Sequence, residues 1–137
     1  MKVQDIMTTK VESVSPRTSL RNAARKMADL GIGSMAVMDG EELLGIITDR
    51  DISVYAIAMG HDPQSTEVQK VMTREVYTCA ESQDISEAAK IMEEHHIRRL
   101  AVTNHGNSVA GFLSVDDLAH VSHELAGAVL ESATPTH

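Results

Sequence analysis

Hydrophobic residues recur along this chain at the spacing of an amphipathic helix in two separate segments. In each segment, apolar side chains stand at positions i, i+3, i+4 and i+7, so that they share one face of a helix. The residues concerned are Leu20, Ala23, Ala24 and Met27 in the first segment, and Ile85, Ala88, Ala89 and Met92 in the second. The sequence therefore predicts two helices, and the paired alanines would let each helix approach a sheet closely.

Short apolar or weakly alternating segments around these helices predict β-strands. A strand is expected before each helix, at 11–14 and 76–79, and a hairpin is expected after it. The hairpin strands are 35–38 and 43–48, then 100–103 and 108–114, with polar turns at 39–42 and 104–107. A further helix begins near Asp49 in the first half and near Val115 in the second, where it is expected to continue from Asp116 to about Leu130.

The resulting order β-α-β-β-α occurs twice because the sequence repeats itself at an offset of 65 residues, as Val3 and Val68 show. We expect one repeat at 1–66, which includes a connection containing Gly and Pro at 60–65, a second repeat at 67–132, and a frayed tail at 133–137. Each half is small for a stable core of its own. The predicted fold class is α+β, sandwich-like, with the two repeats packed about a pseudo-twofold axis.

Composition and charge narrow the class of protein. The chain has 137 residues and a formal net charge of −8, with only 2% aromatic residues, which disfavours nucleic acid as a partner. No apolar segment approaches the roughly 18 residues that span a bilayer, and no signal peptide is recognised, so we expect a cytoplasmic protein without membrane contact. The single cysteine, Cys79, cannot form an intrachain disulfide or a thiolate metal site alone.

Several of the repeated motifs resemble those of tandem CBS-domain proteins, whose paired repeats form a Bateman module. The resemblance is carried by Asp5-Ile6-Met7-Thr8, by Gly45-Ile46-Ile47-Thr48-Asp49-Arg50-Asp51-Ile52 and by His96-Ile97-Arg98-Arg99-Leu100-Ala101-Val102. It is strongest with stand-alone bacterial and archaeal members, including those of the hypoxic-response type. The resemblance implies a non-catalytic sensor that binds AMP, ADP, ATP or S-adenosylmethionine in clefts between the repeats, needs no other cofactor, forms homodimers and signals to an unidentified protein partner.

Two equivalent motifs, Thr48-x-x-Asp51 and Ser114-x-x-Asp117, are the main candidate binding residues. Their spacing alone is typical of helix capping, in which the hydroxyl and the carboxylate accept hydrogen bonds from backbone N–H groups of the first turn. The resemblance implies that the aspartates hold a ribose and that Thr48 and Ser114 lie beside the ribose or phosphate. The two roles are compatible.

The candidate phosphate ligands are arginines, because the guanidinium group matches phosphate geometry. Arg98 and Arg99 open a strand of the second repeat, where the first repeat has Gly33 and Ser34. We therefore expect two clefts of unequal affinity, with Arg99 the better candidate. A pair of surface cations is the alternative for these two residues, and a helix-surface salt bridge is the alternative for Arg50.

Two further positions, Val14 and Cys79, are equivalent in the two repeats, and the resemblance implies that their backbone meets adenine. For their side chains, packing in the core is the alternative. His95-His96 and His120-x-x-His123 could suggest a metal site, and the i, i+3 spacing places His120 and His123 on one helix face. Two imidazoles are too few, and no nearby Cys or second ligand pair completes such a site, so solvent-facing histidines on helices are favoured.

Two other functions remain open at this point. One is a pure assembly module in which the binding site is vestigial. The other is an enzyme that uses acidic side chains, namely Asp49, Asp51, Asp116 and Asp117, although it would lack a nucleophile and base pair.

Overall fold

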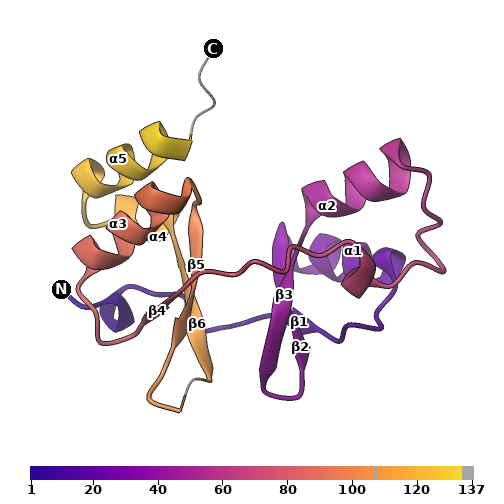
Figure 1. The fold of residues 1–137 in the computed structure, drawn as a ribbon, viewed down its shortest axis with the longest axis horizontal. Helices are drawn as coiled ribbons and strands as arrows, with labels where there is room; N and C mark the ends of the chain where they lie inside the picture. The colour runs from indigo at the N-terminus through magenta and orange to yellow at the C-terminus, as the bar shows by residue number, and fades with distance from the viewer. Residues whose placement is uncertain (107, 134–137) are drawn as a thin grey trace. The chain divides into compact units, whose positions relative to one another are not determined.

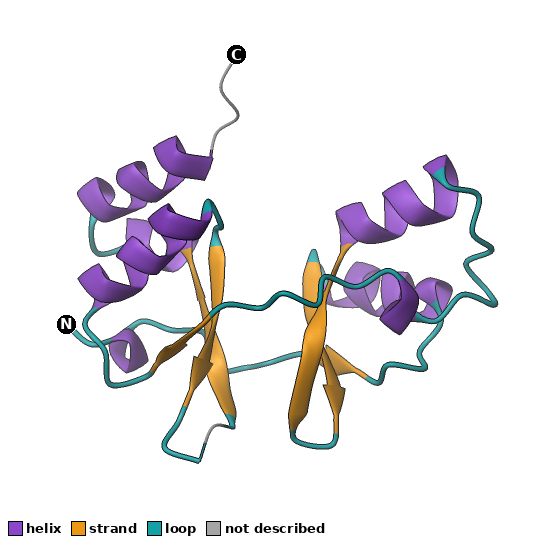
Figure 2. Ribbon diagram, in the orientation of Figure 1, coloured by secondary structure: helices purple, strands orange, loops and turns teal. Residues whose placement is uncertain are grey.

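The computed structural model describes residues 1–106 and 108–133, with the side chain of Ala133 excepted. It divides into two compact units (Figures 1 and 2). Unit 1 contains Met1–Val11 together with the chain from Tyr77 onward, and unit 2 is Glu12–Val76. Each unit has a three-stranded sheet with helices on one face, which confirms the α+β fold class (Figure 2).

Unit 2 contains the strands and helices of the first repeat in the predicted order, followed by a turn from the start of the second repeat. They are β1 (Ser13–Val14), α1 (Leu20–Leu30), β2 (Ser34–Asp39), β3 (Glu42–Thr48) and α2 (Asp49–Ser53), which runs on into the π-helical η2 (Val54–Ala58), and a short 3-10 turn, η3 (Val68–Lys70). The sheet order is β1-β2-β3, with β1 parallel and β3 antiparallel to β2.

Unit 1 has the strands and helices of the second repeat in the same order, preceded by a turn from the start of the first repeat. Its elements are η1 (Val3–Asp5), β4 (Thr78–Ala80), α3 (Ile85–His95), β5 (Arg99–Thr103), β6 (Val109–Ser114), α4 (Val115–Ala119) and α5 (His123–Ala133). The sheet order is β4-β5-β6 with the same strand directions. The turn predicted at 104–107 includes residue 107, and the predicted tail includes 134–137, all of which lie outside the described residues.

Two details of the predicted elements were wrong. The first strands start two residues later than expected, because only Ser13–Val14 and Thr78–Ala80 pair with a neighbouring strand. The long final helix is two helices, since α4 ends at Ala119 and α5 starts at His123. The hydroxyl of Ser122 accepts a hydrogen bond from the N–H of Leu125 at 3.2 Å, as an N-cap residue does, so a new helix begins there.

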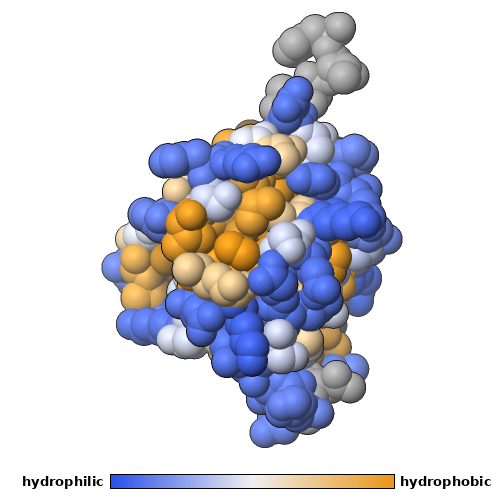
Figure 3. Space-filling model, turned by 90° about the vertical axis from the view of Figure 1, so that its left-hand side faces the viewer, coloured by the Kyte–Doolittle hydropathy of each residue, from blue (hydrophilic) through white to orange (hydrophobic). Residues whose placement is uncertain are grey.

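The predicted apolar stripes form the two cores. All four stripe residues of α3 are buried, and on α1 Leu20, Ala23 and Met27 are buried while Ala24 is half-buried. In unit 1, α5 packs on α3 and α4 and buries Ala126 and Val129 against them. Figure 3 views the side on which α3 and α5 lie and shows apolar residues gathered within a polar surround.

Each unit is completed by the leading segment of the other repeat. Thr8, at the start of the first repeat, exchanges two backbone hydrogen bonds of 2.8 and 2.9 Å with Phe112 of the second. Thr73, its equivalent in the second repeat, exchanges two of 2.9 Å with Ile46 of the first. By sequence, each leading segment belongs to its own repeat. In the structure, it belongs to the compact unit that contains the strands and helices of the other repeat.

Glycine is required where these segments cross the hairpins. A Cβ atom at Gly111 would lie 2.4 Å from the carbonyl oxygen of Thr8, and one at Gly45 would lie 2.6 Å from that of Thr73. Such close approach of two backbones leaves no room for a side chain.

No helix in the described part of the chain is long and apolar enough to cross a membrane.

Candidate functional site

The two Thr/Ser-x-x-Asp motifs lie where a hairpin strand passes directly into a short helix. In unit 2 the Thr48 hydroxyl accepts from the N–H of Asp51 at 3.0 Å, while Asp51 Oδ2 accepts from the N–H of Thr48 at 3.1 Å. In unit 1 the corresponding Ser114 and Asp117 distances are 3.2 and 3.0 Å. Both pairs are reciprocal capping boxes, so capping is confirmed as one role of these residues.

Capping uses only one oxygen of each carboxylate. In Asp117 the second oxygen, Oδ1, lies 3.5 Å from the Thr8 hydroxyl, at the outer limit of a hydrogen bond. Within the described residues, Oδ1 of Asp51 accepts no hydrogen bond. Both aspartates are half-buried, and in each motif the capping bonds orient the carboxylate while leaving its second oxygen unused. The sequence analysis missed Thr8, because its contact with the second repeat depends on the exchanged leading segment.

The residue directly opposite the hydroxyl of each motif in the hairpin ladder differs between the two repeats. In the β5–β6 ladder, Arg99 is directly opposite Ser114, whereas Ser34 is opposite Thr48 in the β2–β3 ladder. Directly opposite residues in an antiparallel pair project from the same face of a sheet and interact. The structure therefore brings Arg99 to the Ser114–Asp117 motif and gives the other motif no equivalent cation at this position.

The other two candidate arginines are exposed and differ in position. Arg98 precedes β5, and its carbonyl oxygen accepts a hydrogen bond from the N–H of Val115 at 2.9 Å. Arg50 is the second residue of α2. The surface salt bridge considered for Arg50 is not formed among the residues that the structure describes.

Val14 and Cys79 point into the two cores, so core packing is confirmed for their side chains. They are 9% and 4% exposed. Val14 pairs with Val37, and Cys79 pairs with Val102, on strands that lie at the edge of each three-stranded sheet. Burial raises the pKa of the Cys79 thiol from its ordinary value of 9.0 to about 11.

The raised pKa of Cys79 predicts a loss of stability at high pH. The folded state holds the thiol proton more tightly than the unfolded state, so its contribution is fully present below about pH 9 and is lost as the pH rises towards 11. Urea denaturation across this range is expected to give a steeper fall in unfolding free energy for the native chain than for Cys79→Ala. If the unfolding free energies of the two proteins fell in parallel as the pH rose, the raised pKa of Cys79 would be contradicted.

The histidines take up separate structural positions. His95 stacks on Tyr77, with ring centroids 3.7 Å apart, and His96 Nδ1 lies 2.9 Å from the carbonyl oxygen of Ser132 in α5. The placement of His120 and His123 on one helix face was wrong, because the chain turns between α4 and α5. No group of three His, Cys, Asp or Glu residues suited to a metal ion occurs in the described ranges.

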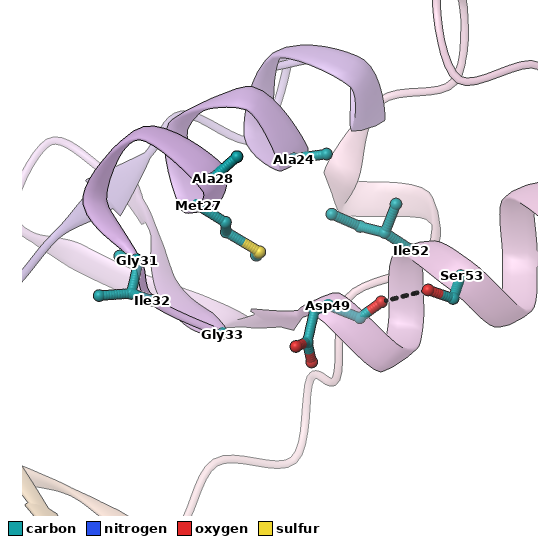
Figure 4. A pocket seen from close by; sticks show the side chains of 9 residues that line it. All are labelled: Ala24, Met27, Ala28, Gly31, Ile32, Gly33, Asp49, Ile52 and Ser53. Carbon is teal, nitrogen blue, oxygen red and sulfur yellow. Dashed lines mark hydrogen bonds between the residues drawn. The ribbon is translucent and has the colours of Figure 1, made fainter.

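A hollow of about 490 Å³ opens between α1 and α2 within unit 2 (Figure 4). Its α1 side carries Ala24, Met27 and Ala28, and Gly31, Ile32 and Gly33 follow this helix. Its α2 side carries Asp49, Ile52 and Ser53. The sequence analysis missed this hollow, although small residues at i and i+4 on α1, Ala24 and Ala28, were a signal that the helix could be approached closely.

Two β-α-β-β-α units, each with a hydroxyl and aspartate capping box after its hairpin, define a paired α+β module. The profile of the CBS domain matches residues 3–57 and again residues 68–124. The chain belongs to the CBS-domain family. A similar relative is the CBS domain-containing protein YhcV of Bacillus subtilis, 37% identical over 130 residues, which are 93% of this chain and 91% of YhcV.

Solved structures share the fold. Hypoxic Response Protein I with two coordinated zinc ions is 29% identical, with a TM-score of 0.78 over 89% of this chain and 99% of that one. The CBS domain pair of MJ0100, in complex with 5′-methylthioadenosine and S-adenosyl-L-methionine, is 24% identical, with a TM-score of 0.78 over 88% and 98%. CBSX2 in complex with AMP is 22% identical, with a TM-score of 0.73 over 87% and 93%.

Proposed function

We propose that this protein is a non-catalytic regulatory module that binds an adenosine-containing ligand through its two hydroxyl and aspartate motifs. The observation that carries the proposal is Oδ1 of Asp51 and of Asp117, which capping leaves unused while the bonds of Oδ2 hold each carboxylate in place. A fixed carboxylate accepts strong, charge-assisted hydrogen bonds from ribose hydroxyl groups. The MJ0100 and CBSX2 complexes support the same class of ligand.

The remaining parts of the ligand follow from neighbouring residues. Thr48 and Ser114 would lie beside the ribose or phosphate. Arg99, opposite Ser114, would bind phosphate at one motif, with Arg98 and Arg50 as further cations. Val14 and Cys79 belong to edge strands, whose outward backbone groups would meet the polar edge of adenine. Ligand binding would favour one of two conformations of the module, which a protein partner could then distinguish.

Isothermal titration of the full chain with adenosine, AMP, ADP, ATP and S-adenosylmethionine tests the proposal. Asp117→Asn keeps an acceptor for the cap but removes the charge, and it should weaken binding about 10-fold or more. Asp116→Asn is the matched control, since Asp116 is exposed and lies outside the capping box. Unchanged affinity in both Asp51→Asn and Asp117→Asn would contradict the ribose assignment.

The same titrations test the role of the arginine. Arg99→Gln should weaken the binding of AMP and ATP but leave the binding of adenosine unchanged. Arg98→Gln should weaken the binding of AMP and ATP less than Arg99→Gln does. If none of the five compounds binds or raises the melting temperature, the alternative of an assembly module without a ligand is supported instead. A bound ligand at 100 times its dissociation constant should stabilise the fold by roughly 2.7 kcal/mol.

A further inference from the structure

The segment that runs from β1 into α1 is basic, although the protein as a whole is acidic. Residues 13–28 contain four basic side chains and no acidic one, in a chain whose formal net charge is −8. The equivalent segment of the second repeat, residues 78–93, contains one basic and four acidic side chains. Both segments form a short strand, a loop and a helix, so the fold does not require the positive charge of the first.

Three of these basic residues are exposed arginines without an acidic partner. They are Arg17, in the loop before α1, and Arg21 and Arg25, which are one turn apart and share a side of α1. No carboxylate of the described residues forms an ion pair with any of them. The helix dipole opposes a cation in the first turn, so helix stability does not explain Arg21. The fourth basic residue, Lys26, instead donates to the carbonyl oxygen of Ser13 at 2.6 Å.

A second basic segment lies beside the loop before α1. The N–H of Val68 donates to the carbonyl oxygen of Thr18 at 2.8 Å, which holds the turn η3 against this loop. The turn carries the exposed Lys70, and the guanidinium of Arg74 donates to the carbonyl oxygen of Gln69 at 2.7 Å. We call these five exposed cations of unit 2 the basic patch: Arg17, Arg21, Arg25, Lys70 and Arg74.

Acidic residues in the neighbouring segments do not neutralise the basic patch. Oε1 of Glu67 accepts a hydrogen bond from Nε2 of Gln69 at 2.7 Å, and Oδ1 of Asp62 accepts one from the N–H of Gln64 at 2.9 Å. Asp29 lies one turn beyond the last arginine of α1 but forms no ion pair with it. The charge of the patch is therefore available to a partner outside the chain.

The spacing of the arginines on α1 fits the acidic side chains of a peptide. Arg21 and Arg25 are four residues apart, which is about 6 Å along a helix axis. Alternate side chains of an extended chain project from one face about 6.6 Å apart. Carboxylates at i and i+2 of an acidic segment can therefore meet both arginines, and each guanidinium can bind a carboxylate through two hydrogen bonds.

The surroundings of the patch favour a peptide over two other polyanions. Single-stranded nucleic acids bind where aromatic side chains stack on their bases, and residues 13–28 and 67–74 contain no aromatic residue. Membrane-surface segments combine basic residues with an apolar face or a lipid anchor. Ser15 and Asn22, which are exposed near the arginines, are polar.

We infer that the basic patch is a docking surface for an acidic, extended segment of a partner protein. The patch includes the loop before α1, whereas the Thr48–Asp51 motif is paired with Ser34, which follows the other end of this helix. The eleven residues of α1 span about 16 Å. The inference does not depend on the binding of an adenosine-containing ligand and is tested without one.

Fluorescence anisotropy of a labelled deca-glutamate peptide, titrated with the full chain, tests this inference. We expect the peptide to bind although the chain carries a net charge of −8, and a deca-glutamine peptide not to bind. Arg21→Glu and Arg25→Glu should each weaken the binding of deca-glutamate about 10-fold or more, because like charges would then face each other. Added salt should also weaken it, since the charges are exposed.

Lys90→Glu is the matched control, because Lys90 is the exposed residue of α3 that corresponds to Arg25. It changes the net charge by the same amount, yet it should change the affinity for deca-glutamate less than about twofold. Circular dichroism should show an unchanged fold in all three variants, since the three positions are exposed. The inference would be overturned by equal losses of affinity in Lys90→Glu and Arg25→Glu, or by a native chain that does not bind deca-glutamate at low salt.

Other occupants of the basic patch would give different results. Deca-uridylate and vesicles of phosphatidylserine and phosphatidylcholine are titrated with the same variants. Tighter binding of either one than of deca-glutamate, lost in Arg25→Glu, would assign the patch to a nucleic acid or a membrane and overturn the inference. A lower mass of Arg25→Glu than of Lys90→Glu in sedimentation equilibrium without peptide would assign it to a second copy, with the same consequence. Titration with adenosine compounds still tests the proposed function independently.

Discussion

Replacing Gly111 by alanine is expected to destabilise the protein by roughly 3 kcal/mol, at the upper end of what overpacking costs. The new Cβ atom would lie 2.4 Å from the backbone oxygen of Thr8, and that oxygen accepts a hydrogen bond from the N–H of Phe112. Neither backbone can move away without breaking the pairing that joins the leading segment to unit 1. Chemical denaturation followed by circular dichroism measures the loss.

Gly127 provides the matched control for this substitution. It lies inside α5, and a Cβ atom there would meet nothing within 4 Å. Alanine is favoured over glycine in a helix by about 1 kcal/mol, so Gly127→Ala should stabilise the protein slightly. If Gly111→Ala were as stable as the native chain, the close crossing of Thr8 over the hairpin would be wrong.

Leu118→Ala is expected to cost about 2–5 kcal/mol, whereas Ile52→Ala should cost roughly 1 kcal/mol. The two residues are equivalent in the repeats, but Leu118 is fully enclosed beneath α5 while Ile52 lines an open hollow and is half-buried. The truncation leaves a sealed cavity only at Leu118. Urea denaturation of the two variants measures the difference in unfolding free energy. Equal losses of unfolding free energy at the two positions would contradict the burial of Leu118 under α5 and the open surroundings of Ile52.

The sequence analysis predicted the helices and hairpins well because a single face of each is buried. The stripes at Leu20 and Ile85 follow the period of a helix, and burial on one side enforces that period. The break after Ala119 was missed for the same reason, since apolar residues continue through Val121 and Leu125 at a helical spacing. Only Ser122, as an N-cap residue, signalled a new helix.

The candidate site was predictable in part. The capping geometry of Thr48 and Ser114 depends on residues three apart in the sequence, so spacing alone was sufficient. The position of Arg99 opposite Ser114 depends on the register of the hairpin, which shifts between Val102 and Thr103. The contact of Thr8 with Asp117 spans 109 residues and depends on which repeat receives the leading segment, and an alignment of two equivalent segments does not contain that information.

The exchanged leading segments have a consequence for how the protein is made. Residues 12–76 form all of unit 2, so this unit can fold on the ribosome soon after Val76 has emerged. Met1–Val11 leaves the ribosome before unit 2 does, but it pairs with Phe112, which is synthesised after unit 2. This leading segment therefore finds its native neighbours only after unit 2 has been made, and a nascent chain stalled before β6 would hold a complete unit 2 and a leading segment without its partner Phe112.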